Sequence, residues 1–478
     1  MLNARIDMRP KTRATPNGVA IAVAGLTVLG LLLRLACAHG DLWLDEIWSL
    51  RNLQHLKNAG DILWRLPNDN NHLLNSLWLW LVGPAAPTVL ARLESIAVGT
   101  LTIPVAAKFC GRSGPAAALT GAGLAAGGAI FVQYGSEARG YAGLLLMIFV
   151  AAEALENILE DSTPRTRLAF AGAVALGALF HLTMLAAAAT LIAAAVLRLA
   201  YRGRPPREIL IAGLDLALLG FLGALPALGL LAASVLNAHL LQEGALTPFS
   251  LAALGHSLTT LYAATLGLPY DLALPLALLA CAGLTLAAVV LIASERLILP
   301  LTCLLLPPLV ATLVQAPNVQ YARFFLVGVL GLVILASDVI ARLWDARRLL
   351  GVFLLVFLMA LGNCIHVGEL FVFGRGNIRP LVARMESHGP ARFATNMPVE
   401  VWVSLNFYDP RGMLSEVQAQ DWCSRPPDWF VLSDQPAAEA STATFGPPQC
   451  RTRYALDMVI PRAPLSGLRF ALYRRAIP

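Results

Sequence analysis

Two adjacent carboxylates, Asp45 and Glu46, are the residues with the clearest chemical potential, and they lie just after the first apolar run of the chain. That run extends from Gly18 to Leu33 and ends at Arg34. Acidic groups beside a membrane span are costly unless they are used, and a carboxylate can take the proton from an attacking hydroxyl group. The placement predicts an enzyme that works at a membrane surface.

Three further polar clusters follow the same pattern, because each lies where a later apolar run begins or ends. They are His72 after Asn71, Glu137 with Arg139, and Tyr321 with Arg323. Arginine binds phosphate through its forked donors, so arginines near a carboxylate could hold a lipid phosphate while a hydroxyl group is activated. We expect these clusters to meet at one depth on one face of the membrane.

The composition places these clusters in a polytopic helical membrane protein. The chain is 57% hydrophobic and 13% charged, whereas soluble domains carry about 25% charged residues. The apolar runs are continuous rather than alternating, which excludes a transmembrane β-barrel. The net charge of +6 comes mostly from basic residues in short loops, which set topology, so we expect no nucleic-acid partner.

Loop charges predict the topology of the helices. Basic residues precede the first run and predict a cytoplasmic N-terminus: Arg5, Arg9, Lys11 and Arg13. Alternating the later loops gives about 11 transmembrane helices, with two short passes that turn near His181. Residues 233–268 are mixed in composition and are expected on the outer face. Ala36-Cys37-Ala38 resembles a signal-peptidase site, but we favour an uncleaved anchor.

The chain divides into a membrane module, residues 1–373, and a soluble tail, residues 374–478. The first outer loop, residues 39–87, is rich in tryptophan, which favours the membrane interface, and it predicts interfacial helices. The tail has the composition of a small α+β domain. Cys423 and Cys450 are expected to form a disulfide there, with two unrelated thiols as the alternative.

The order of these motifs resembles the GT-C superfamily of membrane glycosyltransferases. The nearest branch is the one similar to protein O-mannosyltransferases and lipid A aminoarabinose transferases, and the resemblance covers residues 18–370. The matching segments are Asp45-Glu46, Asn71-His72, Arg92-Leu, Tyr134-Gly-Ser-Glu137-Ala-Arg139-Gly-Tyr141 and Gln320-Tyr321-Ala-Arg323-Phe324. Two features depart from the family pattern: leucines replace the prolines that follow His72, and the late motif has a changed order.

The resemblance implies the transfer of one sugar, a hexose or a pentose, from a polyprenyl phosphate to an acceptor hydroxyl group. It implies a multi-pass protein of the bacterial inner membrane whose tail is periplasmic. The acceptor is left open among a glycolipid, a polysaccharide and a protein. No cofactor is expected, and no residues show metal-ligand spacing, although a divalent cation near Asp45 and Glu46 is left open.

Physical chemistry supports the same roles. Asp45 is the candidate general base, and Glu46 would raise its pKa or orient it. Arg139 and Arg323 would stabilise the leaving phosphate, with help from His72. Glu137 and Tyr321 complete the predicted substrate-binding set. Direct displacement would invert the anomeric centre through an oxocarbenium-like transition state.

Each role has a structural alternative. Asp45 could cap an interfacial helix, Glu137 and Arg139 could pair only with each other, and Arg323 could anchor at the interface. His181 is expected to be a packed histidine at a helix break. Two other functions compete at the level of the whole protein: a transporter or flippase of a lipid-linked glycan, and a ligase that moves whole glycans.

Overall fold

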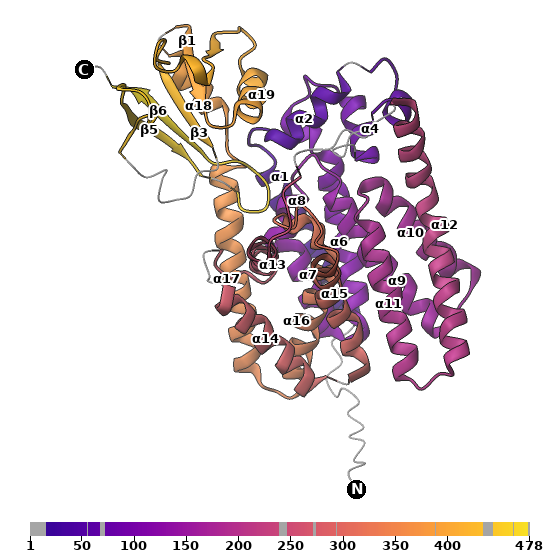
Figure 1. Cartoon of the computed structure of the whole chain (residues 1–478). Helices are drawn as coiled ribbons and strands as arrows, with labels where there is room; N and C mark the ends of the chain where they lie inside the picture. The colour runs from indigo at the N-terminus through magenta and orange to yellow at the C-terminus, as the bar shows by residue number, and fades with distance from the viewer. Residues whose placement is uncertain are drawn as a thin grey trace.

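The protein consists of a bundle of long helices with a small β-sheet at one end (Figure 1). The computed structural model describes residues 16–54, 56–66, 72–238, 246–270, 274–292, 294–387, 389–433, 443–461 and 463–476. Asn71 and the four basic residues that predicted the N-terminal orientation lie outside the described residues.

Eight helices in the described ranges are long and apolar enough to cross a bilayer, by length and composition. They are α1 (Pro16–Cys37), α6 (Leu93–Cys110), α9 (Tyr141–Glu160), α11 (Met184–Tyr201), α12 (Pro206–Ala238), α15 (Ser294–Leu313), α16 (Val327–Asp345) and α17 (Leu349–Phe373). The core lies between them. Among these eight helices α16 is the most enclosed, since 83% of its most apolar 18-residue stretch is buried by the rest of the protein.

Five further helices pack into the same bundle. They are α7 (Pro115–Gly127), α8 (Ala129–Tyr134), α10 (Pro164–Phe180), α13 (Leu251–Leu266) and α14 (Leu274–Leu291). The predicted turn at His181 is confirmed, because α10 ends at Phe180 and α11 begins at Met184. Gly128 separates α7 from α8, so these residues do not form one continuous helix, and the number of membrane crossings stays a prediction.

The outer-face position of one segment stays a prediction. Residues 251–266, which were expected within that segment, form α13, which packs against α8, α14, α16 and α17. The buried threonines of α13 are satisfied within the helix itself, because the hydroxyl groups of Thr259, Thr260 and Thr265 donate to backbone carbonyls four residues earlier. This bonding lets the helix be buried despite its mixed composition.

The break between α7 and α8 is stabilised from two other helices. Arg34 of α1, which is fully buried, donates to the carbonyl oxygens of Ala125 and Ala126 at the end of α7. Asn363 of α17 accepts the backbone N–H of Ala129 at 2.7 Å, where α8 begins. The interruption therefore leaves few backbone groups without partners in the protein interior.

The first outer loop forms short helices at the same end of the bundle as the sheet (Figure 1). They are α2 (Leu44–Leu53), α3 (Asp61–Trp64), α4 (Leu73–Val82) and α5 (Thr88–Ala91). The prediction of helices in this loop is confirmed, and α2 packs against both α4 and α19 of the tail.

The tail is an α+β domain, as predicted, and begins where α17 ends. Its helices are α18 (Arg379–Glu386) and α19 (Pro398–Tyr408), and its sheet has the order β2-β1-β3-β6-β5-β4. The strands are β1 (Ala391–Thr395), β2 (Leu414–Glu416), β3 (Trp429–Ser433), β4 (Thr444–Phe445), β5 (Tyr454–Ile460) and β6 (Phe470–Arg475). The pairs that include β1 are parallel, and the others are antiparallel.

The tail contains the predicted disulfide and is joined closely to the bundle. Cys423 and Cys450 are bonded, with their Cα atoms 5.1 Å apart. Asp41, before α2, accepts hydrogen bonds from the backbone N–H groups of Ile378 and Arg379, where α18 begins. The loop between β5 and β6 sends Ala463 and Leu465 into the hydrophobic core of the bundle.

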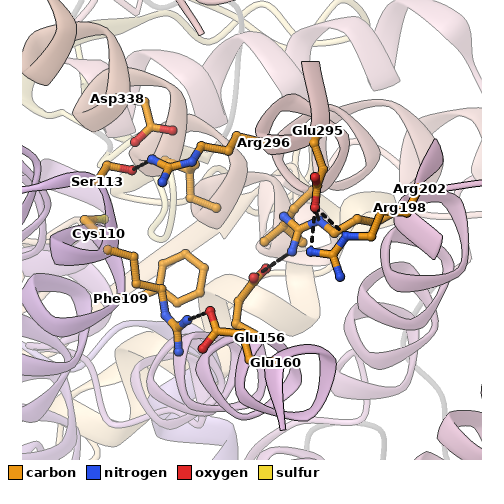
Figure 2. A pocket seen from close by; sticks show the side chains of 13 residues that line it. Phe109, Cys110, Ser113, Glu156, Glu160, Arg198, Arg202, Glu295, Arg296 and Asp338 are labelled. Atoms are coloured by element: carbon orange, nitrogen blue, oxygen red, sulfur yellow. Dashed lines mark hydrogen bonds and ion pairs between the residues drawn. The ribbon is translucent and has the colours of Figure 1, made fainter. Parts of the chain in front are cut away.

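The opposite end of the bundle contains a cavity of about 480 Å³ among charged side chains (Figure 2). Arg198 of α11 and Arg202, which follows α11, converge on Glu295 of α15, and Arg198 also bonds Glu156 of α9 at 2.6 Å. On the other side of the cavity, Arg296 donates to Ser113. We interpret these bonds as cross-links between helix ends, since no described lining side chain has a buried polar atom without a partner.

Candidate active site

Asp45 lies in the first turn of α2, and its carboxylate faces two arginines from distant parts of the chain. Its Oδ2 atom is 3.3 Å from a terminal nitrogen of Arg323 and 3.6 Å from one of Arg139. The Asp45 side chain is 18% exposed and that of Arg323 is 16% exposed. The structure therefore brings together three of the predicted site residues in a place that solvent can reach.

Arg323 is oriented by aromatic rings. It belongs to a short 3-10 helix, Ala322–Phe325, that precedes α16. The guanidinium carbon lies 4.1 Å from the ring centroid of Tyr321 and 5.8 Å from that of Phe324. Such stacking holds a cation in place without neutralising it. Tyr321, a predicted substrate-binding residue, is 38% exposed, and the face of its ring contacts the Arg323 guanidinium group.

Arg139 is delivered by the segment between α8 and α9. One terminal nitrogen donates to the Ser49 hydroxyl at 3.3 Å, and the other donates to the Tyr141 hydroxyl at 3.1 Å. Ser49 lies four residues after Asp45 in α2, so both share one face of that helix. These bonds fix the guanidinium group beside the Asp45 carboxylate.

Glu46 faces the interior, although it adjoins Asp45 in sequence. Its carboxylate pairs with Arg92 in a bidentate arrangement at 2.6 and 2.8 Å, and both side chains are fully buried. It also accepts the backbone N–H groups of Trp43 and Ala138. The bond to Trp43 helps α2 begin, and the bond to Ala138 ties α2 to the segment that carries Arg139.

The pKa of Glu46 reflects this pairing. Burial alone would raise the pKa, but the Arg92 charge and hydrogen bonds, with the Arg375 charge and the Ala138 N–H, lower it below its usual value. Glu46 is therefore charged and saturated with donors, which favours a structural role. Its predicted catalytic role stays a prediction.

Glu137 is also buried, and its partner is Arg375 rather than Arg139. The Arg375 Nε atom is 3.4 Å from Glu137 Oε2, and both side chains are at most 1% exposed. Burial raises the pKa of the Glu137 carboxyl group, although Arg375 opposes the rise. Arg375 also donates to the Gln133 carbonyl and the Ser136 hydroxyl. Glu137 is thus buried in the protein and pairs with Arg375, and its predicted contact with substrate stays a prediction.

His72 lies at the start of α4, beside the arginines. Its Nδ1 atom is 3.0 Å from the carbonyl oxygen of Phe180, and its ring contacts those of Tyr141 and His181, with centroids 5.4 and 4.7 Å away. Burial, followed by the Arg139 charge, lowers the pKa of His72 well below its usual value. This shift disfavours the charged form of the ring, and the predicted help of His72 at the phosphate stays a prediction.

His181 is part of this cluster, although sequence reasoning treated it as a packed histidine. Its ring lies 5.0 Å from that of Tyr141, and its Nδ1 atom accepts hydrogen bonds from the backbone and the hydroxyl group of Thr183. Burial and the charges of Arg139 and Arg323 lower its pKa to about 3. The signal for this position was the interruption of a long apolar stretch at a histidine.

Sequence reasoning also missed the partners of the buried acids. Arg92 was recognised only as the start of a helix, and Arg375 was not singled out, although it is the first cation after the last apolar run. At the site itself, the Asp45 carboxylate and the two guanidinium groups of Arg139 and Arg323 together carry one net positive charge. The described residues contain no group of three or more His, Cys, Asp or Glu that could hold a metal ion.

Comparisons with known proteins assign no family to this chain. No protein-family model matches the chain, and no curated protein matches it. Among solved structures, the chain is similar to the crystal structure of ArnT from Cupriavidus metallidurans bound to undecaprenyl phosphate, with 13% identity and a TM-score of 0.33. It is similar to the apo state of the same protein with 14% identity and a TM-score of 0.34. Both matches cover 96% of this chain and 98% of the other. TM-scores this low assign neither a family nor a function.

Proposed function

We propose that this protein is a membrane glycosyltransferase that moves one sugar from a polyprenyl phosphate to an acceptor hydroxyl group. The observation that carries the proposal is the approach of Arg139 and Arg323 to the Asp45 carboxylate at the end of an apolar helical bundle. A sugar phosphodiester carries one negative charge, which matches the one positive charge of these three side chains. A base and a phosphate site are the two parts that this transfer needs.

The proposed step is a direct displacement. The Asp45 carboxylate takes the proton of the acceptor hydroxyl group, and the acceptor oxygen attacks the anomeric carbon. The bond between that carbon and the phosphate oxygen breaks, and the released polyprenyl phosphate keeps the electron pair. Arg139 and Arg323 stabilise the growing negative charge through forked donors, so no general acid is required. Attack from the side opposite the phosphate inverts the anomeric centre.

We also propose a bacterial inner-membrane location with the Asp45 end and the tail in the periplasm. The disulfide between Cys423 and Cys450 supports an oxidising compartment for the tail. The arginines at the other end, which include Arg198 and Arg202, support a cytoplasmic location for that end. α11 joins the two ends, since it starts beside His181 and finishes at Tyr201.

An Asp45→Asn variant tests the proposal, because the amide keeps the shape of the side chain and cannot take a proton. We expect sugar transfer from a polyprenyl-phosphate donor by the purified protein to fall about 10²–10⁴-fold. A panel of hexose and pentose donors, with lipid extract as acceptor and mass spectrometry as readout, identifies the product.

The matched control is Asp457→Asn in the tail, where the aspartate pairs with Arg384 and is 14% exposed. Both variants should insert and unfold like the unmodified protein, and the control should keep its transfer activity. Full transfer by Asp45→Asn would remove the proposed mechanism. Movement of an intact lipid-linked glycan across proteoliposomes, with no new glycosidic bond, would instead identify a flippase.

A further inference from the structure

Among the residues beside Asp45, His72 has an unusual hydrogen-bonding state. Its Nδ1 atom faces the Phe180 carbonyl oxygen at 3.0 Å, and a carbonyl group can only accept, so the proton must lie on Nδ1. The backbone holds this geometry, because Gly140 has no Cβ and lets the Phe180 carbonyl approach closely. The tautomer of His72 is thus fixed by the fold.

The other ring nitrogen of His72 has no hydrogen-bond partner in the described part of the chain, and it is shielded from solvent. The His72 residue as a whole is 4% exposed. The titratable groups that face it are Arg139, Arg323, His181 and Tyr141, and both arginines disfavour a second proton on the ring. Nε2 therefore carries a buried lone pair, which costs free energy unless something donates to it.

We infer that His72 Nε2 accepts a hydrogen bond from a hydroxyl group of the transferred sugar and does not contact the donor phosphate. This inference rests on the proposed function. A phosphodiester has no proton to donate, so it cannot bond to a lone pair. An ammonium group could donate, but two nearby guanidinium groups repel it. On a polyprenyl-phosphate sugar, the neutral donors nearest the phosphate are the hydroxyl groups of the sugar.

The distances agree with a sugar attached to a bound phosphate. Arg139 bonds the hydroxyl group of Tyr141, and the Tyr141 ring contacts that of His72 at 5.4 Å between centroids. His72 is thus one aromatic ring away from the proposed phosphate position. Nε2 is covered in this structure, so contact with a sugar requires the Tyr141 or His181 ring to turn.

Three substitutions at position 72 separate the two chemistries. Gln places a carbonyl acceptor near the Nε2 position, Asn keeps only a donor for Phe180, and Lys supplies the cation that a phosphate would need. We expect kcat/KM for sugar transfer to fall about tenfold for His72→Asn, less for His72→Gln, and most for His72→Lys. Transfer that is best preserved by His72→Lys would overturn the inference.

Binding of bare undecaprenyl phosphate to the full-length protein separates this inference from the proposed function. We expect Arg323→Ala to weaken that binding and His72→Asn to leave it unchanged, because the probe has no sugar. A loss of probe affinity in His72→Asn would place His72 at the phosphate and overturn the inference alone. No loss in Arg323→Ala would contradict the proposed phosphate site.

A spectroscopic readout is independent of activity. In protein labelled with ¹⁵N-histidine, the signals that vanish in His72→Gln belong to His72. We expect those signals to show a protonated Nδ1 and an unprotonated Nε2 at pH 6.5, the usual pKa of histidine. A doubly protonated ring at that pH would overturn the inference.

Discussion

Neighbouring carboxylates have opposite environments in this protein. The Asp45 side chain faces Arg323 and is partly exposed to solvent, whereas the Glu46 side chain is buried and pairs with Arg92. Successive residues of a helix are about 100° apart, so one helix can present one acid to the site and the other to the interior. Asp45 is therefore the candidate base, and Glu46 holds helix α2 in place through its bonds to Arg92 and Ala138.

Replacement of Glu46 by Gln should destabilise the protein strongly. The change leaves the Arg92 guanidinium buried without its counter-charge, which costs about 3–5 kcal/mol. Thermal unfolding in detergent measures the loss, and Glu386→Gln in the tail is a control, since its partner Arg411 is exposed. An unchanged midpoint in Glu46→Gln would show that the buried pair contributes little.

The same residue predicts a pH dependence. Because the folded chain lowers the pKa of Glu46, its contribution to stability is complete above the unfolded pKa of about 4.3 and is lost as the pH falls through the lower folded value. We expect the difference in midpoint between the unmodified protein and Glu46→Gln to shrink as the pH falls below about 4. A constant difference from pH 6 to pH 3 would contradict this assignment.

At the scale of elements, a broken helix positions the site. Arg34 bonds the end of α7 and Asn363 bonds the start of α8, and α8 then leads into the segment that ends with Arg139. An unbroken helix would continue in one direction, whereas the break at Gly128 lets the chain change course inside the protein. The position of Arg139 thus depends on residues from α1 and α17.

A methyl group at Gly140 should damage this arrangement. A Cβ atom there would overlap the Phe180 carbonyl oxygen and crowd His72 Nδ1. We expect Gly140→Ala to lower transfer at least tenfold and to reduce the melting temperature, since buried backbone must shift. Gly123→Ala in α7 is the matched control, because nothing lies within 4 Å of its Cβ position. Equal behaviour of the two variants would contradict the proposed close packing.

At the scale of the molecule, the tail completes the interior of the bundle. Arg375 pairs with Glu137, Asp41 caps α18, and Ser466 accepts a hydrogen bond from Gln133 at 3.3 Å. Each contact joins a late segment of the chain to the first outer loop or to the segment before Arg139. The tail is therefore a support for the candidate site, in addition to any role in recognising an acceptor.

Removal of the Arg375 charge tests this support. We expect Arg375→Met to destabilise the protein by about 3–5 kcal/mol, because Glu137 is left buried and unpaired. Adding Glu137→Gln should recover most of the loss, as expected for coupled residues. Unfolding midpoints of both single variants and the double variant measure the coupling. Additive effects would show that the pair does not interact.

Much of this architecture could be predicted from the sequence, because hydropathy and loop charge report directly on membrane helices. Hydropathy, charge and tryptophan content predicted the turn at His181, the helices of the first loop and the meeting of Asp45 with Arg139 and Arg323. The two cysteines of the soluble tail predicted the disulfide. The sequence did not predict the contacts between buried polar side chains. The sequence marks Arg34 only as the end of the first apolar run, and nothing in it singles out Arg375. The threonine hydroxyl groups of α13 bond within their own helix. Local patterns do not reveal partners from distant helices.

The loop between β5 and β6 has a consequence for synthesis. Ala463 and Leu465 fill space between helices made much earlier, and Arg375 reaches Glu137 only after α17 has been inserted. A ribosome must therefore release nearly the entire polypeptide before the first outer loop acquires its final supports. We expect a chain that stops before residue 463 to lack the packing of Ala463 and Leu465 in the bundle core.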